Sequence, residues 1–486
     1  MNESQELDSG DELAALLEAE LAGTEEGNES PARDGPAAKK PRLASAAVAS
    51  SCPPHPGFMG GICIRCGALK DEADEVGVAL SYIHRGLEVS RHEAERMRQG
   101  TADRLLAHRK LLLILDLDHT LLNSNRFQDI PPQFEHVLHA QVEAQQADAP
   151  MLYRLPHMKM WTKLRPGVRQ FLEQAKESFE LAVYTMGDRD YAREMALLLD
   201  PGGRLFGGRV ISSGDSTQRH VKDLDVVLGR ERAVLVLDDT EGVWPRHRDN
   251  LVQIERYLYF PADAARFGYR GHSLLERAVD ESAEGGALAT CLGVMEQVQQ
   301  QFFAQGNAST ADVRPLLQAS RRRILAGVRV LFSRVMPRDC ADPTVHPLWQ
   351  LAVKLGAECL RNADDWVTHV VATNITDKTR WAEGQAMHVV NPSWLWCCAY
   401  TWTRAKEDGF PVAARGAAAQ LAPPKSEAED LAAAMAAAGG GTAPTSQQPA
   451  DGADVDGAGA AAAVDGAAEP EAVDCSTAQQ PPVETS

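Results

Sequence analysis

The sequence predicts an α/β fold built on a parallel sheet with helices on both faces. Three largely apolar runs that end in polar residues predict its strands, because such continuous runs are typical of strands buried on both faces. These runs are RKLLLILDLD at 109–118, FELAVYT at 179–185 and AVLVLDD at 233–239. Between the last two lies the amphipathic stretch DYAREMALLLD at 190–200, which predicts a helix. Strands that alternate with helices are typical of a parallel sheet.

The charge of the chain is concentrated at its two ends. The 486 residues, 44% of them apolar, are enough for two or three domains with sizeable cores. The net charge is −19, but residues 1–30 hold ten acidic and no basic residues, and residues 411–486 have a net charge of −9. The remaining residues are neutral overall, so the low isoelectric point says little about what the folded part binds. The acidic start is unlike a signal peptide and no apolar run is as long as a membrane span, so we expect an intracellular protein.

Composition divides the chain into six segments. The end segments 1–50 and 413–486 are rich in small and acidic residues and are expected to be disordered. The four segments between them are a Cys/His element with a helical lead-in at 51–108, an α/β domain at 109–262, a helical connector at 263–318 and a small α/β domain at 319–412. The stretch AAKKPR at 37–42 is a candidate nuclear import signal, with a chance cluster of charges as the alternative.

Polar side chains stand at the C-terminal end of each predicted strand. They are Asp116, Asp118, Thr120, Thr185, Asp238 and Asp239. Because ligands bind at this edge of an open parallel sheet, we expect these side chains to converge. Carboxylates that lie close together repel one another, and Asp oxygens suit Mg²⁺, which often bridges to a phosphate. The sequence therefore predicts a magnesium site that accepts a phosphoryl group.

The pair Asp116 and Asp118 fits the chemistry of phosphoryl transfer. One carboxylate attacks phosphorus and becomes an aspartyl-phosphate. The other, two residues away, protonates the leaving oxygen and then activates a water molecule. Thr185 and Lys222, which lies just ahead of the third strand, would hold the phosphoryl oxygens. The alternative is that DLDHT is a strand-terminal turn without chemistry, but its place after an apolar strand, with YTMG and VLDD behind it, favours catalysis.

The segment LLLILDLDHTLLNS resembles the first motif of the haloacid-dehalogenase superfamily. More narrowly, the chain is similar to the RNA polymerase II C-terminal-domain phosphatases of the TFIIF-associating type, in their plant or algal branch. Across residues 76–260 the resemblance is carried by GVALSYIHRGLEVS, KLRPGVRQFLEQA, ELAVYTMGDRDYAREMALLLDP, RVISSGD, HVKDLDVVLG and VLVLDDTEGVW. It implies a haloacid-dehalogenase-like Rossmannoid sheet over the catalytic domain 109–262. It also implies a nuclear, Mg²⁺-dependent protein serine/threonine phosphatase that acts on the heptad repeats of the polymerase and regulates transcription.

The resemblance implies a role for each acid of the site. Asp116 would be the nucleophile and Asp118 the acid and base. Mg²⁺ would be held by Asp116, the backbone carbonyl of Asp118, and Asp239. Asp238 would support Lys222 and the shell of the metal.

The resemblance also implies that Thr185 and Lys222 bind the phosphoryl group of the substrate. Thr120, in the same motif as the two acids, is a further candidate catalytic residue. Arg209, in RVIS, falls where the family places an arginine near the phosphate, with an ordinary surface charge as the alternative. The insertion after the first strand, about 125–160, is modest, which favours an open groove suited to a polypeptide. Along it, Lys159 and Lys163 would be available to phosphoserines.

Residues 320–412 resemble a BRCT domain. The resemblance is carried by ILAGVRVLFSR, HPLWQLAVKLGAE, VTHVVA, TDKTRWA and VVNPSWLWCCAYTW. It implies a phosphopeptide pocket at Ser333, Thr376 and Lys378; plain protein docking or a structural brace is the alternative. Residues at helical spacing near its end are expected in the core: Trp394, Leu395, Cys398 and Trp402.

Cys52 and His55, followed by Cys63 and Cys66, have the spacing of zinc ligands. A structural Zn²⁺ site is one interpretation and a reduced loop is the other. Expected partners are the phosphorylated polymerase tail and, through the BRCT domain or the acidic tails, general transcription factors; no nucleic acid or membrane is expected. Two competing functions remain open: a non-catalytic BRCT adaptor with a phosphatase-like domain, and a small-molecule phosphatase of the same superfamily.

Overall fold

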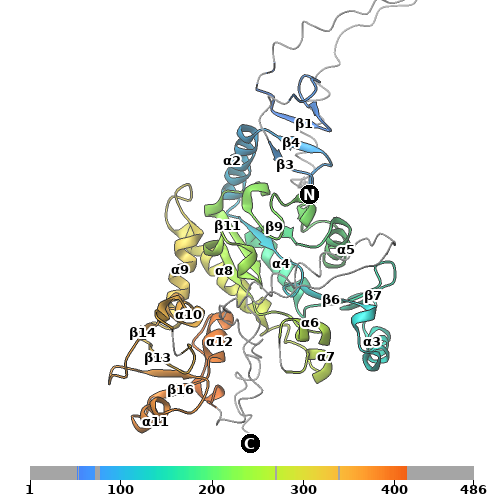
Figure 1. The fold of residues 1–486 in the computed structure, drawn as a ribbon. Helices are drawn as coiled ribbons and strands as arrows, with labels where there is room; N and C mark the ends of the chain where they lie inside the picture. Colours follow the sequence, from blue (N-terminus) through green and yellow to red (C-terminus); the bar gives the residue numbers. More distant parts are fainter. Residues whose placement is uncertain (1–51, 53, 72–76, 269–270, 338–339, 413–486) are drawn as a thin grey trace, which may run out of the picture. The chain divides into compact units, whose positions relative to one another are not determined.

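A computed structural model describes residues 52, 54–71, 77–268, 271–337 and 340–412 (Figure 1). The predictions for 1–50, for the stretch AAKKPR and for 413–486 lie outside these residues. Contacts divide the described chain into two compact units. The first unit is formed within 52–115, 172–236 and 302–313, and the second within 116–171, 237–301 and 314–412.

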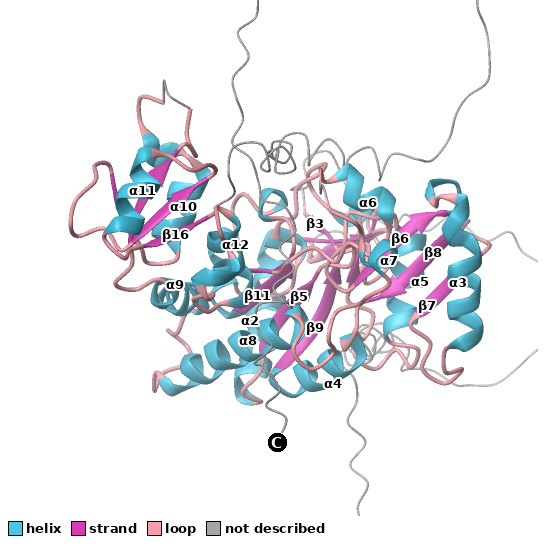
Figure 2. Cartoon of the chain, turned by 90° about the horizontal axis from the view of Figure 1, so that it is seen from below, coloured by secondary structure: helices cyan, strands magenta, loops and turns pink. Residues whose placement is uncertain are grey.

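The three predicted strands are confirmed and belong to one five-stranded sheet of order β10-β9-β5-β11-β12. The strands are β5 (Leu111–Leu115), β9 (Phe179–Tyr184), β10 (Val210–Ile211), β11 (Val234–Asp238) and β12 (Leu251–Gln253). β5 pairs with β9 in parallel, and β9 pairs with β10 in parallel. Every residue of β5 and of β11 is buried, as the continuous apolar runs LLLIL and VLVL predict, and the burial extends to Asp238 at the end of β11. Figure 2 shows β9, β5 and β11 side by side.

Two helices of the first unit begin with side-chain caps. α2 (Arg91–Ala107) begins after Ser90, whose hydroxyl accepts a hydrogen bond from the backbone of Glu93. α5 (Arg189–Leu199), the predicted helix, begins after Asp188, whose carboxylate accepts from the backbone of Tyr191. Such caps satisfy backbone N–H groups that have no partner inside the helix. α4 (Val168–Ser178) precedes β9.

A small antiparallel sheet precedes α2 in the first unit. Its order is β2-β1-β4-β3. The strands are β1 (Gly57–Met59), β2 (Ile62–Cys63), β3 (Val78–Ala79) and β4 (Leu87–Val89). The four predicted zinc ligands lie together at β1 and β2.

The insertion after β5 forms a three-stranded antiparallel sheet of order β6-β8-β7 in the second unit. The strands are β6 (Leu122–Arg126), β7 (Leu152–Leu155) and β8 (Met160–Leu164), and α3 (Pro132–Ala144) connects β6 to β7. Leu138 of α3 and Trp161 of β8 are buried in one apolar cluster with Tyr257, Tyr259 and Phe260. The insertion is thus modest, as expected, and its apolar core is shared with the segment that follows β12.

The segment 263–318 is less helical than predicted. It holds α6 (Pro261–Arg266), α7 (Leu274–Arg277), α8 (Ala287–Ala304) and the start of α9 (Val313–Ile324). The stretch MEQVQQQFF lies in α8, as predicted. Residues 279–286 form turns and irregular chain, because Gly285 and Gly286 are poor helix formers.

A four-stranded parallel sheet of order β14-β13-β15-β16 follows in the second unit. The strands are β13 (Arg329–Ser333), β14 (Glu358–Leu360), β15 (His369–Ala372) and β16 (His388–Val390), and the helices are α10 (Pro347–Lys354), α11 (Asp377–Gly384) and α12 (Ser393–Thr401). Trp394, Leu395 and Cys398 are buried in its core and Trp402 is partly buried against it, as predicted. The α/β class of this segment is confirmed, and its assignment as a BRCT domain stays a prediction.

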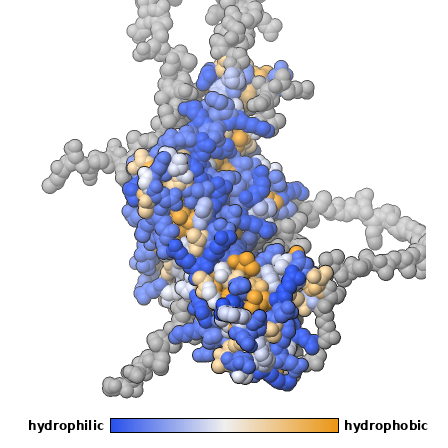
Figure 3. Space-filling model, turned by 90° about the vertical axis from the view of Figure 1, so that its left-hand side faces the viewer, coloured by the Kyte–Doolittle hydropathy of each residue, from blue (hydrophilic) through white to orange (hydrophobic). Residues whose placement is uncertain are grey.

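The face of the molecule in Figure 3 is mostly hydrophilic, with apolar residues in small groups. Among the described residues, no helix combines the length and the apolar composition needed to cross a membrane.

Gly356 is predicted to be irreplaceable between α10 and β14. Its φ is +98°, and a Cβ there would lie 1.9 Å from the carbonyl oxygen of Arg322. We expect Gly356→Ala to destabilise this sheet by more than about 3 kcal/mol, because the overlap with backbone adds to the cost of the left-handed conformation. Gly327→Ala is the matched control: φ there is +81° but no atom lies within 4 Å, so the cost should be roughly 1 kcal/mol. Amide exchange of peptides from 324–412 measures both, and equal losses would contradict the steric argument.

His369 makes the stability of this sheet depend on pH. Its buried ring stacks on Trp394 at 4.9 Å and on His388 at 4.8 Å, and its Nε2 lies 3.2 Å from Glu407. Burial lowers the pKa of His369 to about 4, and Arg404 and His388 add to this against the opposing hydrogen bond of Glu407. As the pH falls, His369 is protonated in the unfolded chain before it is protonated in the folded one. The free energy of unfolding should therefore fall by up to about 3 kcal/mol between about pH 6.5 and pH 4.

His369→Gln should remove most of that pH dependence, since no imidazole is left to be protonated on unfolding. Amide exchange of 324–412 at the two pH values gives the comparison, with the exposed His272→Gln as control. An unchanged pH dependence in His369→Gln would show that another group is responsible.

Candidate active site

The segment DLDHT forms a tight turn directly after β5. The Asp116 amide donates to the carbonyl of Leu237 at 3.0 Å. The carbonyl of Leu117 accepts from the amides of Leu121 and Leu122 at 2.9 and 3.1 Å. His119, with φ of 64°, donates its amide to Leu122 at 2.7 Å. The backbone on both sides of Asp118 is therefore held by hydrogen bonds, which suits a site that needs fixed carboxylates.

Arg165, which directly follows β8, supports this turn and was missed by sequence reasoning. Its side chain is buried, and its Nη1 donates to the carbonyl of Thr120 at 3.0 Å. Its Nε and Nη2 donate to the two carboxylate oxygens of Glu281 at 2.8 and 2.7 Å. The sequence indicated Arg165 only as a basic residue in KLRP, between a predicted strand and a predicted helix. Its hydrogen-bond partners lie far from it in the sequence, so they could not be predicted.

Asp116, Asp238 and Asp239 come together as a buried acid cluster. One carboxylate oxygen from each lies within 4.8 Å of those of the others. The Asp238 carboxylate accepts from the indole Nε1 of Trp244 and from the amide of Thr240, both at 2.9 Å. Three carboxylates at this separation repel one another strongly unless donors or cations stabilise their charge.

Asp239 is stabilised by a cation. Arg256 donates its Nε to Asp239 at 2.7 Å, and the hydroxyls of Thr240 and Thr120 lie 2.9 and 3.5 Å from the same carboxylate. Burial by itself raises the pKa of Asp239, but the charge of Arg256, followed by His119 and the hydrogen bonds of Arg256 and Thr240, holds it below its usual value. Asp239 is therefore ionised at neutral pH.

The cluster is compatible with Mg²⁺. The three side chains supply oxygen donors, which hard divalent cations prefer over nitrogen and sulfur. They also carry three negative charges at close range, and Asp239 is paired with Arg256. A cation that binds few protein ligands and keeps several waters fits such a donor set.

Thr185 and Lys222 belong to the first unit, and their approach to the acid cluster stays a prediction. Thr185 is buried at the end of β9, where its hydroxyl accepts from the amide of Gly187 at 3.0 Å. Lys222 is also buried, with its ammonium 6.0 Å from the centre of the Tyr184 ring. Burial of a lysine is costly, which is typical of a functional or paired residue.

Arg209 and Lys163 have partners in the structure, and their roles toward substrate stay predictions. Arg209 donates its Nε to the carbonyl of Leu181 at 2.9 Å. Lys163 in β8 pairs with Asp280 at 2.8 Å and lies over the ring of Tyr259. Lys159 lies exposed in the turn between β7 and β8.

Ser333 and Thr376 come together in the C-terminal sheet. Their hydroxyl oxygens lie 2.8 Å apart, and Thr376 caps α11 by accepting from the amide of Thr379 at 3.2 Å. Lys378 is exposed in the first turn of α11. A phosphate contact at these residues stays a prediction.

Removal of Arg256 should destabilise the acid cluster. Because Arg256→Met leaves Asp239 buried without its cationic partner, we expect the free energy of unfolding to fall by about 3 kcal/mol at pH 7. The lowered pKa of Asp239 gives stability that is present above the usual Asp value near 3.8 and is lost as pH falls through the lower folded value. The deficit of the variant should therefore be largest at neutral pH and shrink below pH 4.

Amide exchange of peptides from 234–260 at several pH values measures this deficit. Arg248→Met is the control, because Arg248 is half-exposed and its Nε lies 3.9 Å from Glu241, so its loss should cost less than about 1 kcal/mol. Equal effects of the two substitutions would refute a special role of Arg256.

Comparison with known proteins agrees with this geometry. Residues 111–274 match the family of NLI interacting factor-like phosphatases. The chain is 45% identical over 362 residues to RNA polymerase II C-terminal domain phosphatase-like 4 of Arabidopsis thaliana, covering 73% of this chain and 81% of that protein. It is also 45% identical over 332 residues to RNA polymerase II C-terminal domain phosphatase-like 3 of the same plant, covering 66% of this chain and 27% of that protein.

A solved structure of Fcp1, an essential RNA polymerase II CTD phosphatase, has a similar fold. Its TM-score is 0.52 at 24% identity, with 65% of this chain and 100% of that chain covered. At this identity the likeness shows the fold alone. Together with the sequence identity to the plant proteins, these findings show that the chain belongs to the family of RNA polymerase II C-terminal domain phosphatase-like proteins with an NLI interacting factor-like phosphatase domain.

Proposed function

We propose that this protein is a Mg²⁺-dependent protein serine/threonine phosphatase that dephosphorylates the heptad repeats of the C-terminal domain of RNA polymerase II. The observation that carries the proposal is the buried cluster of Asp116, Asp238 and Asp239 at the ends of β5 and β11. Family membership supports the same activity, because the relatives are named as RNA polymerase II C-terminal domain phosphatase-like proteins.

In the first step, a carboxylate oxygen of Asp116 attacks the phosphorus of a phosphoserine. The bond between phosphorus and the serine oxygen breaks, and Asp118 gives its proton to that oxygen as it leaves. The products of this step are an aspartyl-phosphate at Asp116 and a serine hydroxyl. The hydrogen-bonded turn around Asp118 supports this role, because it holds in place the backbone that carries both acids.

In the second step, water attacks the phosphorus of the aspartyl-phosphate. Asp118, now ionised, takes a proton from that water, and the bond between phosphorus and Asp116 breaks. Inorganic phosphate leaves, and both acids return to their starting protonation states. The same residue thus serves as acid and then as base.

Mg²⁺, when bound by Asp116, Asp239 and the backbone carbonyl of Asp118, supplies positive charge to the phosphoryl oxygens. Asp238 is held by Trp244 and Thr240, which leaves it in place to orient the metal shell and Lys222. Thr185 and Lys222 hold the remaining phosphoryl oxygens as negative charge develops on them.

A polypeptide substrate is favoured over a small molecule. The insertion after β5 is modest and forms a three-stranded sheet and α3, which share an apolar cluster with residues 257–260. This modest size supports a groove that stays open to a polypeptide. Action on the polymerase places the protein in the nucleus. Contacts with general transcription factors through the C-terminal sheet or the acidic tails are a further part of the proposal.

The C-terminal sheet is proposed as a BRCT domain. Its parallel order β14-β13-β15-β16 with α10, α11 and α12 supports this assignment. The hydroxyl of Ser333 at the end of β13 lies beside that of Thr376, which caps α11, and Lys378 lies in the first turn of that helix. These positions support a phosphopeptide contact there. Docking of an unphosphorylated protein is the alternative for this surface.

The test compares hydrolysis of p-nitrophenyl phosphate and of phosphorylated heptad peptides by the full chain with Mg²⁺ and with a chelator. We expect wild type to prefer the peptides and to need Mg²⁺. Asp116→Asn should abolish turnover of both substrates, because its amide is a poor nucleophile. Rapid quenching of wild type with labelled peptide should place the label on the peptide that contains Asp116.

Asp190→Asn is the matched control, since Asp190 is an exposed acid at the start of α5, and it should keep full activity. Absence of wild-type turnover on both substrates would favour the non-catalytic adaptor and contradict the proposal. Turnover without preference for the peptides would favour a small-molecule phosphatase.

A further inference from the structure

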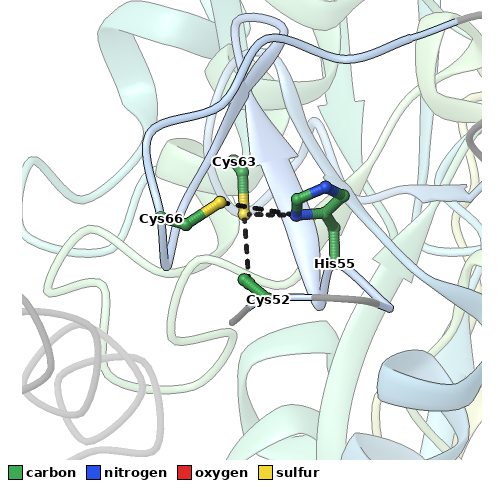
Figure 4. Close-up of side chains that lie close together, drawn as sticks. All are labelled: Cys52, His55, Cys63 and Cys66. Atoms are coloured by element: carbon green, nitrogen blue, oxygen red, sulfur yellow. Dashed lines mark hydrogen bonds between the residues drawn. The ribbon is translucent and has the colours of Figure 1, made fainter. Parts of the chain in front are cut away.

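Four side chains of the first unit form a second cluster that the phosphatase chemistry does not use. Figure 4 shows Cys52, His55, Cys63 and Cys66 pointing toward one another. The Sγ atoms of Cys52 and Cys63 lie 3.9 Å apart. The Nδ1 atom of His55 lies 3.2 Å from the Sγ of Cys63 and 3.5 Å from that of Cys66. One ligand atom from each residue lies within 4.8 Å of the others.

These separations match the edges of a zinc tetrahedron. With Zn–S bonds of about 2.3 Å and a Zn–N bond of about 2.0–2.1 Å, the S–S edges are about 3.8 Å and the S–N edges about 3.5 Å. A disulfide requires sulfur atoms about 2.05 Å apart, and the cysteines at this site are free. The cluster thus has the geometry of metal ligands, not of a covalent bridge.

The backbone around Cys63 and Cys66 is shaped to present both sulfurs on one side. The amide of Arg65 donates to the Sγ of Cys63 at 3.5 Å. Gly67, with φ of +72°, donates its amide to the carbonyl of Cys63 at 3.0 Å, and the amide of Cys63 donates to Ala68 at 2.8 Å. An amide hydrogen bond to sulfur stabilises a thiolate, which is the form that binds metal.

The sheet that carries these residues has little apolar core at this end. The cluster beneath β1 and β2 is formed by Cys52, Phe58 and Cys63, with Cys66 packed against it. β1 has three residues and β2 has two. So small a core does not offset the conformational entropy of the chain, and small elements of this kind are usually held by disulfides or metals.

We propose that Cys52, His55, Cys63 and Cys66 hold a structural Zn²⁺ through three thiolates and the Nδ1 of His55. Four protein ligands fill the tetrahedron and leave no position for a water molecule, so the site is structural and separate from the phosphatase chemistry. The proposal does not rest on the proposed function.

The zinc site would also support the segment that carries Lys222, within the same unit. Leu80, Leu87 and Val89 of the small sheet form an apolar cluster against which Leu228 packs. Arg98 of α2 donates to the carbonyls of Asp225 and Val227. Loss of zinc should therefore loosen residues 213–228 as well as β1 and β2.

The first test is metal analysis of the full chain, purified without a metal-binding tag and without chelator. We expect about one zinc ion per chain in wild type. Cys66→Ser and His55→Ala should lose it, whereas Cys340→Ser, which changes a cysteine of the second unit, should keep it. His55→Cys should keep zinc, because a fourth thiolate replaces the imidazole and the variant guards against loss through misfolding.

The second test replaces zinc by Co²⁺ and follows the thiolate-to-metal absorption. Its intensity should rise in His55→Cys relative to wild type, because four thiolates replace three. Removal of the metal should raise amide exchange in 54–71 and 213–228 and leave 324–412 unchanged. Wild type without zinc, or zinc retained by both Cys66→Ser and His55→Ala, would overturn the proposal.

Discussion

The mutual repulsion of three buried carboxylates is the constraint on which the candidate active site depends. Asp116, Asp238 and Asp239 lie within reach of one another in a region of low polarity, where charge repulsion is strong. Arg256 and Trp244 offset part of it by donating to Asp239 and Asp238. Carboxylates held this close together favour the binding of a divalent cation, and a bound cation would in turn attract a negatively charged phosphoryl group.

Holding such a cluster in place requires a rigid surrounding, and the second unit provides it. Asn123 of β6 donates to Asp263 at 2.6 Å, and its carbonyl oxygen accepts from the amides of Tyr259 and Phe260 at 2.9 and 3.0 Å. These bonds join the three-stranded sheet to the segment that follows β12. Arg165 joins the same sheet to the turn after Asp116. Buried polar networks whose members all have partners stiffen a site in this way.

Sequence reasoning succeeded where the signal was local. Largely apolar runs predicted β5, β9 and β11, because a strand buried on both faces is made mostly of apolar residues. Four acids at the ends of β5 and β11 were expected to meet because parallel strands share an edge. The structure places Asp116, Asp238 and Asp239 together, and Asp118 is not in that group. The prediction of a helical 263–318 was too broad, since apolar periodicity does not reveal where the chain turns at Gly285 and Gly286.

The sequence by itself determined the α/β class, three clustered acids and the four residues of the Cys/His cluster. These features could be predicted because both the apolar pattern of a buried strand and the spacing of metal ligands involve residues that are close together in the sequence. The tertiary structure alone decided that Arg256 balances Asp239, that Arg165 secures the turn, and that Lys163 pairs with Asp280. From the sequence, several other basic or acidic residues were equally good candidates for each of these pairs. Only the folded chain selects among them, because the energy of an ion pair depends on distance and burial and not on order in the sequence.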